Sequence, residues 1–117
     1  IGTGPLSEKE ESIVPIRAAA AMLKETHVSS LKFFPIKGTA HLAELETVAK
    51  AAAEFDMMIE PTGGITPDNV EAVVRTCMEA GAVHIMPHLY ASLKDESGML
   101  ELYKMERAVE AIRRALR

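Results

Sequence analysis

Short apolar segments alternate along the chain with longer stretches in which apolar residues recur every three or four positions. The short segments cover residues 30–35, 57–60 and 83–87, and their length and flanking turn residues predict strands. Because these segments begin at residues 30, 57 and 83, a unit of one strand, one helix and two loops repeats at a nearly constant interval. The chain is therefore predicted to consist of repeated βα units.

The longer stretches predict amphipathic helices, because their apolar residues fall on one face at a period of about 3.6 residues. Thr39 is the expected N-cap of the second helix and Thr66 that of the third, which continues through Pro67 and ends at Gly81. Residues 95–98 are the expected loop before the last helix. The expected buried positions are, in chain order, Ile16, Ala20 and Leu23; Leu42, Leu45, Ala49 and Ala52; Val70, Val73, Val74, Cys77 and Met78; and Leu102, Met105, Val109, Ile112 and Leu116.

Alternating strands and helices predict an α/β fold with a parallel sheet and right-handed crossovers. Two architectures fit this pattern, an open doubly wound sheet and part of a (β/α)8 TIM barrel. A complete barrel needs about 200 residues or more, whereas this chain has 117. We therefore interpret residues 1–117 as about the C-terminal half of one TIM-barrel domain, with three full βα units and the end of an earlier one. The start at Ile1, without a methionine, is consistent with a truncated N-terminal side.

Composition and charge exclude several classes of function. The net charge is −4 with both signs interspersed, so no basic face indicates nucleic-acid binding. No apolar run is long enough to cross a bilayer, so we expect no membrane association. Cys77 is the only cysteine, which excludes an intramolecular disulfide and favours a cytoplasmic location.

Lys32 is a charged residue within an otherwise apolar predicted strand. Side chains alternate along a strand, so Lys32 and Phe34 share one face while Phe33 lies on the other. If the face of Lys32 is the interior of a barrel, partial desolvation favours the neutral amine, which can attack a ketone and form a Schiff base. Taken alone, a strand lysine more commonly keeps its ammonium group in water at the end of a sheet.

Thr62, Gly63 and Gly64 directly follow the next predicted strand. Glycines allow the sharp turn that presents backbone N–H groups to an anion, and a helix beginning near Thr66 would add its positive end. One interpretation is therefore a phosphate-binding loop. The other is an ordinary glycine-rich turn between a strand and a helix.

Glu60 lies two residues before Thr62, so both side chains are expected on the same side of the strand. A carboxylate there, near Lys32, could transfer protons or tune the amine. The alternative is a structural ion pair with Lys32 or with a basic group on a neighbouring strand.

His88 and Ser92 lie in the polar segment that follows the third predicted strand, and both could contact a phosphate. A capping or loop-packing role for His88 is equally compatible with the sequence. The other histidines show no metal-ligand spacing with one another or with Cys77, so no metal site is expected.

Two segments in this order, LKFFP at residues 31–35 and PTGGI at residues 61–65, resemble the class I aldolases that cleave 2-keto-3-deoxy-6-phosphogluconate. The pair is far more specific than either segment alone. TGPLS at residues 3–7, Glu60, and PHLYAS at residues 87–92 are similar to the branch of this family associated with the breakdown of sugar acids and amino-sugar acids. The resemblance covers nearly the whole chain and corresponds to the C-terminal half of the family's barrel.

This resemblance implies a role for each matching residue. Lys32 would form the Schiff base with the C2 ketone of the substrate. The family's usual general acid/base glutamate, and the group that holds the pyruvate carboxylate, lie on early strands that this chain lacks. Glu60 is therefore the local candidate for a catalytic base, although relatives have an apolar residue or a cysteine at its position. The residues expected to bind the substrate and its phosphate are Thr3, Thr62, Gly63, Gly64, His88 and Ser92.

The implied reaction is that of a lyase, the cleavage of a phosphorylated 2-keto-3-deoxy sugar acid to pyruvate and glyceraldehyde 3-phosphate, without a metal or other cofactor. The resemblance also implies a homo-oligomer, often a trimer. Two alternatives stay open. An isomerase, epimerase or synthase on a phosphate-binding barrel would use the glycine loop without an imine. An isolated half-barrel would expose strand edges and an apolar face, and would be inactive on its own.

Overall fold

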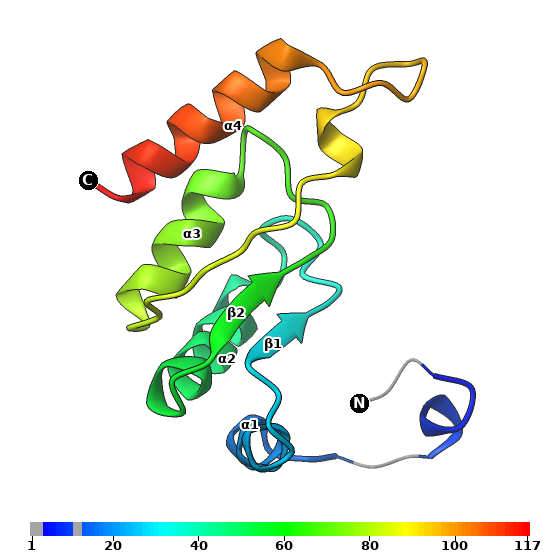
Figure 1. Cartoon of the computed structure of the whole chain (residues 1–117), viewed down its shortest axis with the longest axis vertical. Helices are drawn as coiled ribbons and strands as arrows, with labels where there is room; N and C mark the ends of the chain where they lie inside the picture. The colour runs from blue at the N-terminus through cyan, green and yellow to red at the C-terminus, as the bar shows by residue number, and fades with distance from the viewer. Residues whose placement is uncertain (1–3, 11–12) are drawn as a thin grey trace.

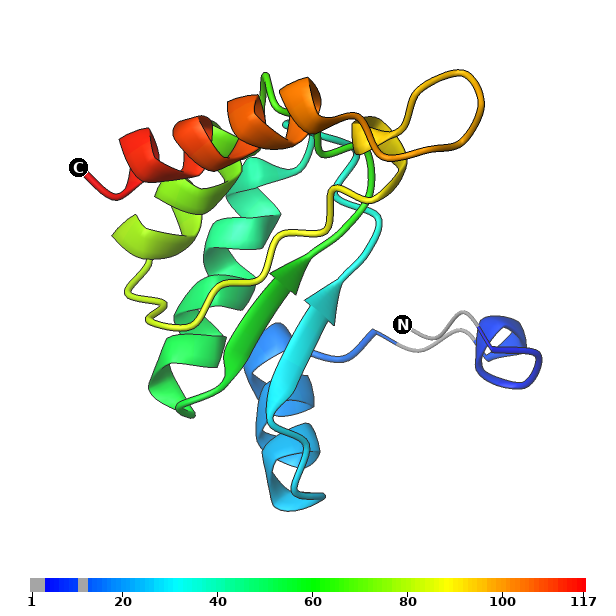
Figure 2. The same cartoon turned by 45° about the horizontal axis from the view of Figure 1, so that its top comes forward.

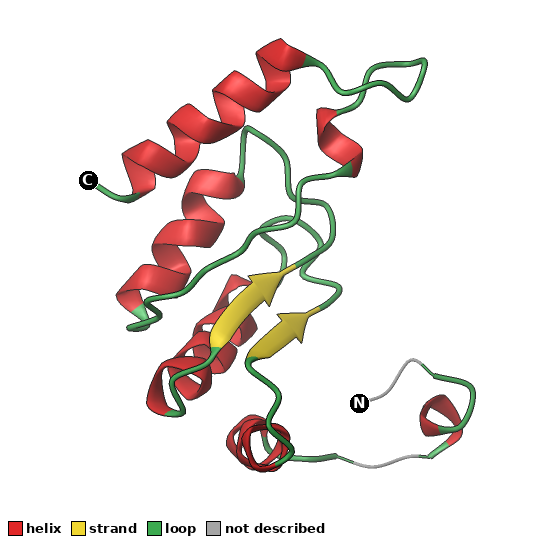
Figure 3. Cartoon of the chain, viewed as in Figure 1, coloured by secondary structure: helices red, strands yellow, loops and turns green. Residues whose placement is uncertain are grey.

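The computed structural model describes residues 4–10 and 13–117 of the chain. Helices and strands alternate along it, as the sequence pattern predicts (Figures 1 and 3). The helices are η1 (Ser7–Lys9), α1 (Ile16–Glu25), α2 (Leu42–Glu54), α3 (Val70–Glu79), η2 (Ala91–Leu93) and α4 (Leu102–Ala115), and the strands are β1 (Ser30–Phe33) and β2 (Met58–Pro61).

Strands β1 and β2 pair in parallel, which confirms the predicted parallel sheet. Their register places Ser30 opposite Met58 and Lys32 opposite Glu60. Strand β1 lies within its predicted segment and ends at Phe33, whereas β2 begins one residue after the start of its predicted segment and continues one residue beyond it, to Pro61. The described residues therefore form an α/β domain around a parallel sheet.

The predicted strand over residues 83–87 is wrong as a regular strand. This segment lies beside β2 as an extended chain, visible in yellow in Figure 2, and makes only isolated parallel bridges, between Ile59 and Ile85 and between Thr62 and His88. Its backbone still exchanges two hydrogen bonds with Ile59, and the His88 N–H donates to the carbonyl of Pro61 at 3.0 Å. Within the described part of the chain its outer edge has no partner strand, so the ladder is incomplete.

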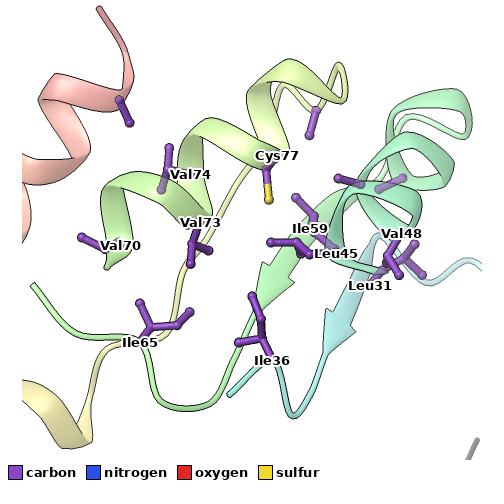
Figure 4. Packing of buried hydrophobic residues seen from close by; sticks show 14 of the residues in the cluster. Leu31, Ile36, Leu45, Val48, Ile59, Ile65, Val70, Val73, Val74 and Cys77 are labelled. Atoms are coloured by element: carbon purple, nitrogen blue, oxygen red, sulfur yellow. The ribbon is translucent and has the colours of Figure 1, made fainter. Parts of the chain in front are cut away.

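Helices α2 and α3 cover one face of the sheet (Figures 1 and 4). Leu45 of α2, Val73 of α3 and Ile59 of β2 are fully buried between them. Burying each such side chain contributes about 1.5–3 kcal/mol, so this layer supplies much of the driving force for folding. The predicted buried faces of α2 and α3 are thereby confirmed.

The opposite face of the sheet is not covered by any described helix. Side chains alternate along each strand, so Leu31 and Ile59 face the helices, while Ser30, Lys32 and Glu60 face the open side. The two faces are chemically distinct: the covered face is apolar and the open face carries the polar side chains.

The structure confirms the predicted helix caps only in part. Thr66 caps the turn that leads into α3: its hydroxyl accepts a hydrogen bond from the Asp68 N–H, and Asn69 Oδ1 accepts one from the Thr66 N–H at 2.8 Å. The regular helix begins only at Val70. Thr39 is not the N-cap of α2; His41 holds that position, without a side-chain hydrogen bond, because a further turn separates Thr39 from the helix.

The predicted buried stripe of α4 is wrong for most of its members. Ala108, Ala111 and Ala115 are the buried residues, whereas Leu102 is 69% exposed and Leu116 59% exposed. The small alanines pack α4 close against α3, and Arg114 and Arg107 pair with Glu71 and Asp68 to fix this orientation. The larger apolar residues consequently point away from the core.

Candidate functional site

Polar groups from three neighbouring chain segments meet on the open face of the sheet. Ser30 begins β1 and Lys32 lies near its end, Glu60 lies near the end of β2, and His88 follows the segment beside β2. The parallel register brings these groups together although they are far apart in sequence. The carboxyl edge of a parallel sheet is where α/β proteins commonly bind their ligands.

Glu60 is the centre of this group. Ser30 Oγ donates a hydrogen bond to Glu60 Oε2 at 2.7 Å, and His88 Nε2 lies 3.3 Å from Glu60 Oε1. The hydrogen bond from Ser30 lowers the pKa of the Glu60 carboxyl most strongly, and His88 and the charge of Lys32 lower it further. Partial burial raises it, but the net result is a pKa below its usual range, so the carboxylate is ionised at neutral pH.

Lys32 lies opposite Glu60 in the strand register. The desolvation expected for a lysine that faces a barrel interior stays a prediction, because Lys32 is exposed in this structure. Lys32 is exposed because no element among the described residues covers the open face of the sheet. Lys32 instead lines the edge of an apolar groove of about 340 Å³ between α1, β1 and α2.

The glycine loop after β2 lines a separate cavity of about 500 Å³. Within the described residues, the N–H groups of Gly63, Gly64 and Ile65 donate no hydrogen bond. Two hydrogen bonds to its carbonyls hold the loop in place: the Gly38 N–H donates to the Gly63 carbonyl, and Asn69 Nδ2 donates to the Gly64 carbonyl. The cavity is lined by residues from two loops: Thr62, Gly63, Gly64, Ile65, Thr66, His88, Leu89, Tyr90, Ala91 and Ser92.

Gly64 cannot be replaced without strain. Its φ is +66°, and a Cβ there would lie 2.9 Å from the backbone nitrogen of Gly38. The two loops that follow β1 and β2 therefore touch through their backbones, and this contact sets the distance between the Lys32 strand and the glycine loop.

The structure thus brings together most of the residues expected from the sequence. Thr62 and Ser92 line the cavity, with their hydroxyls donating to the carbonyls of Glu60 at 3.1 Å and Leu89 at 2.9 Å. His88 lies between the cavity and Glu60, contacting both. Thr3 lies outside the described residues.

Ser30 is the residue that sequence reasoning missed. Its position two residues before Lys32 predicts that both share one strand face, which was the available signal. Its contact with Glu60 depends on the register between β1 and β2, which the sequence alone does not specify.

Two features are absent from the described residues, 4–10 and 13–117. In these ranges no three of the His, Cys, Asp and Glu side chains are grouped so that they could hold a metal ion. In the same ranges, no helix has the length and apolar character needed to span a membrane.

The fold and site define an α/β protein with an ionised carboxylate, an amine and a glycine-rich loop at one edge of a parallel sheet. Comparison with known proteins is consistent with this class. The family model of the KDGP aldolases matches residues 1–97, and the chain belongs to this family of aldolases. A 2-dehydro-3-deoxy-phosphogluconate aldolase from Salmonella typhimurium (strain 14028s / SGSC 2262) is 43% identical over 83 residues. This match spans 70% of the chain and 34% of the relative, so the chain corresponds to about a third of that protein.

Proposed function

We propose that this chain carries the Schiff-base lysine and the phosphate-binding loop of a class I aldolase. Its substrate would be 2-dehydro-3-deoxy-6-phosphogluconate, cleaved to pyruvate and glyceraldehyde 3-phosphate. The observation that supports this most strongly is the register of Lys32 with Glu60, one βα unit before a glycine loop that lines a cavity. Membership of the aldolase family and the name of the Salmonella relative support the same activity.

In the proposed reaction, the neutral amine of Lys32 attacks the C2 ketone, and loss of water gives a protonated imine. The C3–C4 bond then breaks as Glu60 takes the proton of the C4 hydroxyl, and the electron pair of that bond moves into the imine to form an enamine. Glyceraldehyde 3-phosphate leaves. Protonation of the enamine at C3 and hydrolysis of the imine release pyruvate and restore Lys32.

The phosphate would be held in the cavity by the N–H groups of Gly63 and Gly64, with Thr62, His88 and Ser92 around it. Thr3 is proposed to assist, as the family resemblance implies. Phosphate binding away from the cleaved bond would orient the substrate and contribute binding energy to the reacting centre.

We further propose that residues 1–117 form the C-terminal half of a (β/α)8 barrel in a homo-oligomeric cytoplasmic enzyme. The open polar face of the sheet would then look into the barrel, where Lys32 would be shielded from water. The exposed position of Lys32 in this chain predicts negligible turnover by the chain alone. Adding the part of the Salmonella relative outside the shared region should restore turnover, and measurable retro-aldol activity without it would refute this dependence.

Trapping of the imine tests the chemistry directly. The chain, alone and with the complementing segment, is incubated with pyruvate and borohydride, and its peptides are weighed by mass spectrometry. We expect one added carboxyethyl group on the peptide that contains Lys32, lost in Lys32→Met and retained in the control Lys50→Met, since Lys50 pairs with Glu46 on the surface of α2. A Lys32 peptide without added mass under both conditions would sink the aldolase proposal.

One observation favours a second candidate. Lys32 is exposed and lines a different groove from the one formed by the glycine loop. An isomerase, epimerase or synthase would need the phosphate loop and Glu60 but no imine. The absence of trapped imine, together with binding of a phosphorylated sugar at the loop, would support this class instead.

A further inference from the structure

Ser30, Glu60 and His88 form a hydrogen-bonded row across three parallel segments of the open face, and this row is not explained by phosphate binding or by the core. We propose that Ser30 and His88 are positioning residues that hold the Glu60 carboxylate for proton transfer beside Lys32. This inference rests on the proposed aldolase function and adds two residue roles to it. His88 would then act through Glu60, rather than mainly on the phosphate.

The geometry fixes the carboxylate from both sides. Each oxygen of Glu60 has one partner, Ser30 at 2.7 Å and His88 at 3.3 Å, and the two partners come from opposite neighbours of β2. Rotation of the carboxylate would break one or both contacts. Because a carboxylate has about four lone-pair sites and these contacts use two, acceptor capacity remains for a substrate hydroxyl.

The row is poorly explained as a purely structural feature. The Glu60 side chain is 20% exposed and that of His88 35% exposed, and both lie on the face opposite the core. A stabilising role would be served as well by apolar residues packed against a neighbour, whereas two polar side chains that contact one carboxylate keep a single group charged and oriented. That group lies in register with Lys32, the only other charged side chain near it on the adjacent strand.

The charge state fits a base that must be ionised before it can accept a proton. The contacts with Ser30 and His88 hold the pKa of the Glu60 carboxyl below its usual range despite partial burial. The titratable groups that act on Glu60 are Lys32 on β1 and His88 beyond β2, and both favour the carboxylate form. Loss of either positioning residue should therefore raise the pKa of Glu60 and loosen its orientation.

Exchange of the pyruvate methyl protons in D₂O separates this role from phosphate binding, because pyruvate has no phosphate and its exchange needs only Lys32 and a base. The measurement uses the chain under the conditions that give a trapped imine. Ser30→Ala and His88→Leu should each slow exchange about tenfold to a hundredfold while imine trapping at Lys32 persists. The conservative variants Ser30→Thr and His88→Gln, which keep a donor, should recover much of the rate.

Matched controls are available on the same chain. Ser29→Ala removes the neighbouring hydroxyl, which makes no side-chain hydrogen bond among the described residues, and His41→Leu removes a histidine whose side chain makes none there either. Both should leave exchange unchanged. If His88→Leu leaves exchange unchanged and instead raises KM for the phosphorylated substrate, His88 is a phosphate ligand and the inference is overturned for it.

Titration of the Glu60 carboxyl by NMR gives a second readout that does not depend on activity. Ser30→Ala should move the Glu60 pKa upward, and His88→Leu should do so by less, since the Ser30 contact is the stronger influence. An unchanged titration in Ser30→Ala would overturn the proposed network even if exchange fell. If no imine forms in the wild-type chain but both titrations shift, the aldolase proposal fails while the Glu60 network is upheld as a feature of the structure.

Discussion

Replacing Gly64 by alanine tests whether the backbone contact between the two loops holds the site together. The residue has a φ of +66°, a conformation that costs an alanine about 1–2 kcal/mol relative to its preferred backbone. A Cβ at Gly64 would also lie 2.9 Å from the Gly38 nitrogen and 3.3 Å from the Lys37 carbonyl carbon. Both neighbours are backbone atoms, so the loops would have to separate.

Gly98 provides the matched control. Its φ is +85°, but a Cβ there would meet nothing within 4 Å, so Gly98→Ala pays the conformational cost without the contact. The effect of alanine on the unfolded chain is the same in both variants and cancels in the comparison. Overpacking against backbone costs about 1–3 kcal/mol, so Gly64→Ala should lower the free energy of unfolding by that much more than Gly98→Ala.

Urea denaturation of the two variants and the wild-type chain, followed by circular dichroism, measures this difference. We also expect Gly64→Ala to weaken the hydrogen bond from the Gly38 N–H to the Gly63 carbonyl, which is 3.0 Å long. Amide hydrogen exchange at Gly38 measures this weakening. Equal destabilisation by the two variants, with unchanged exchange at Gly38, would show that the loops do not touch as described.

Three further predictions concern the core and the surface. Burial raises the pKa of the Cys77 thiol to about 12, so iodoacetamide should leave it unmodified in the folded chain at pH 8 and modify it in urea; rapid labelling without urea would contradict its burial. Ala111→Leu should destabilise the chain by about 1–3 kcal/mol because Ala111 is fully buried against α3, whereas Val109→Lys, on the exposed side of α4, should change the urea midpoint little. The hydrogen bond from Arg114 lowers the pKa of Glu71 in the folded chain. This pair therefore stabilises the folded chain at pH values above the pKa of an unfolded glutamate, and the stabilisation is lost as pH falls through the pKa of Glu71 in the folded state. Glu71→Gln should make the free energy of unfolding depend less on pH in this acidic range, most clearly at low salt.

The covered layer of the fold could be predicted from the sequence because it depends on local periodicity. Leu45, Ala49 and Ala52 recur at helical spacing, and all three are buried against the sheet. The same rule predicted the wrong buried residues for α4. Periodicity identifies an amphipathic helix but not the neighbour it contacts, and here the small Ala108 and Ala111 allow the closer approach to α3.

Most residues of the candidate site could be predicted from the sequence, whereas the contacts between them could not. Lys32, Glu60 and the glycines were identifiable by residue type and by position after a strand. The pairing of Glu60 with Ser30 and His88 was not, because it depends on strand register and on an extended segment that is not a regular strand. Register is set by long-range packing, which one strand's sequence does not contain.

The alternation of side chains along β1 and β2 explains why one short sheet serves both stability and chemistry. Leu31 and Ile59 are fixed in the core, so the next residue of each strand, Lys32 and Glu60, is held in position on the opposite face. A one-residue slip of β1 against β2 would place Lys32 in the core and Leu31 on the open face, at the cost of a buried charge. The hydrophobic layer therefore enforces the Lys32–Glu60 register. Variants that loosen this layer, such as Leu45→Ala, should disturb the site even though every residue of the site is unchanged.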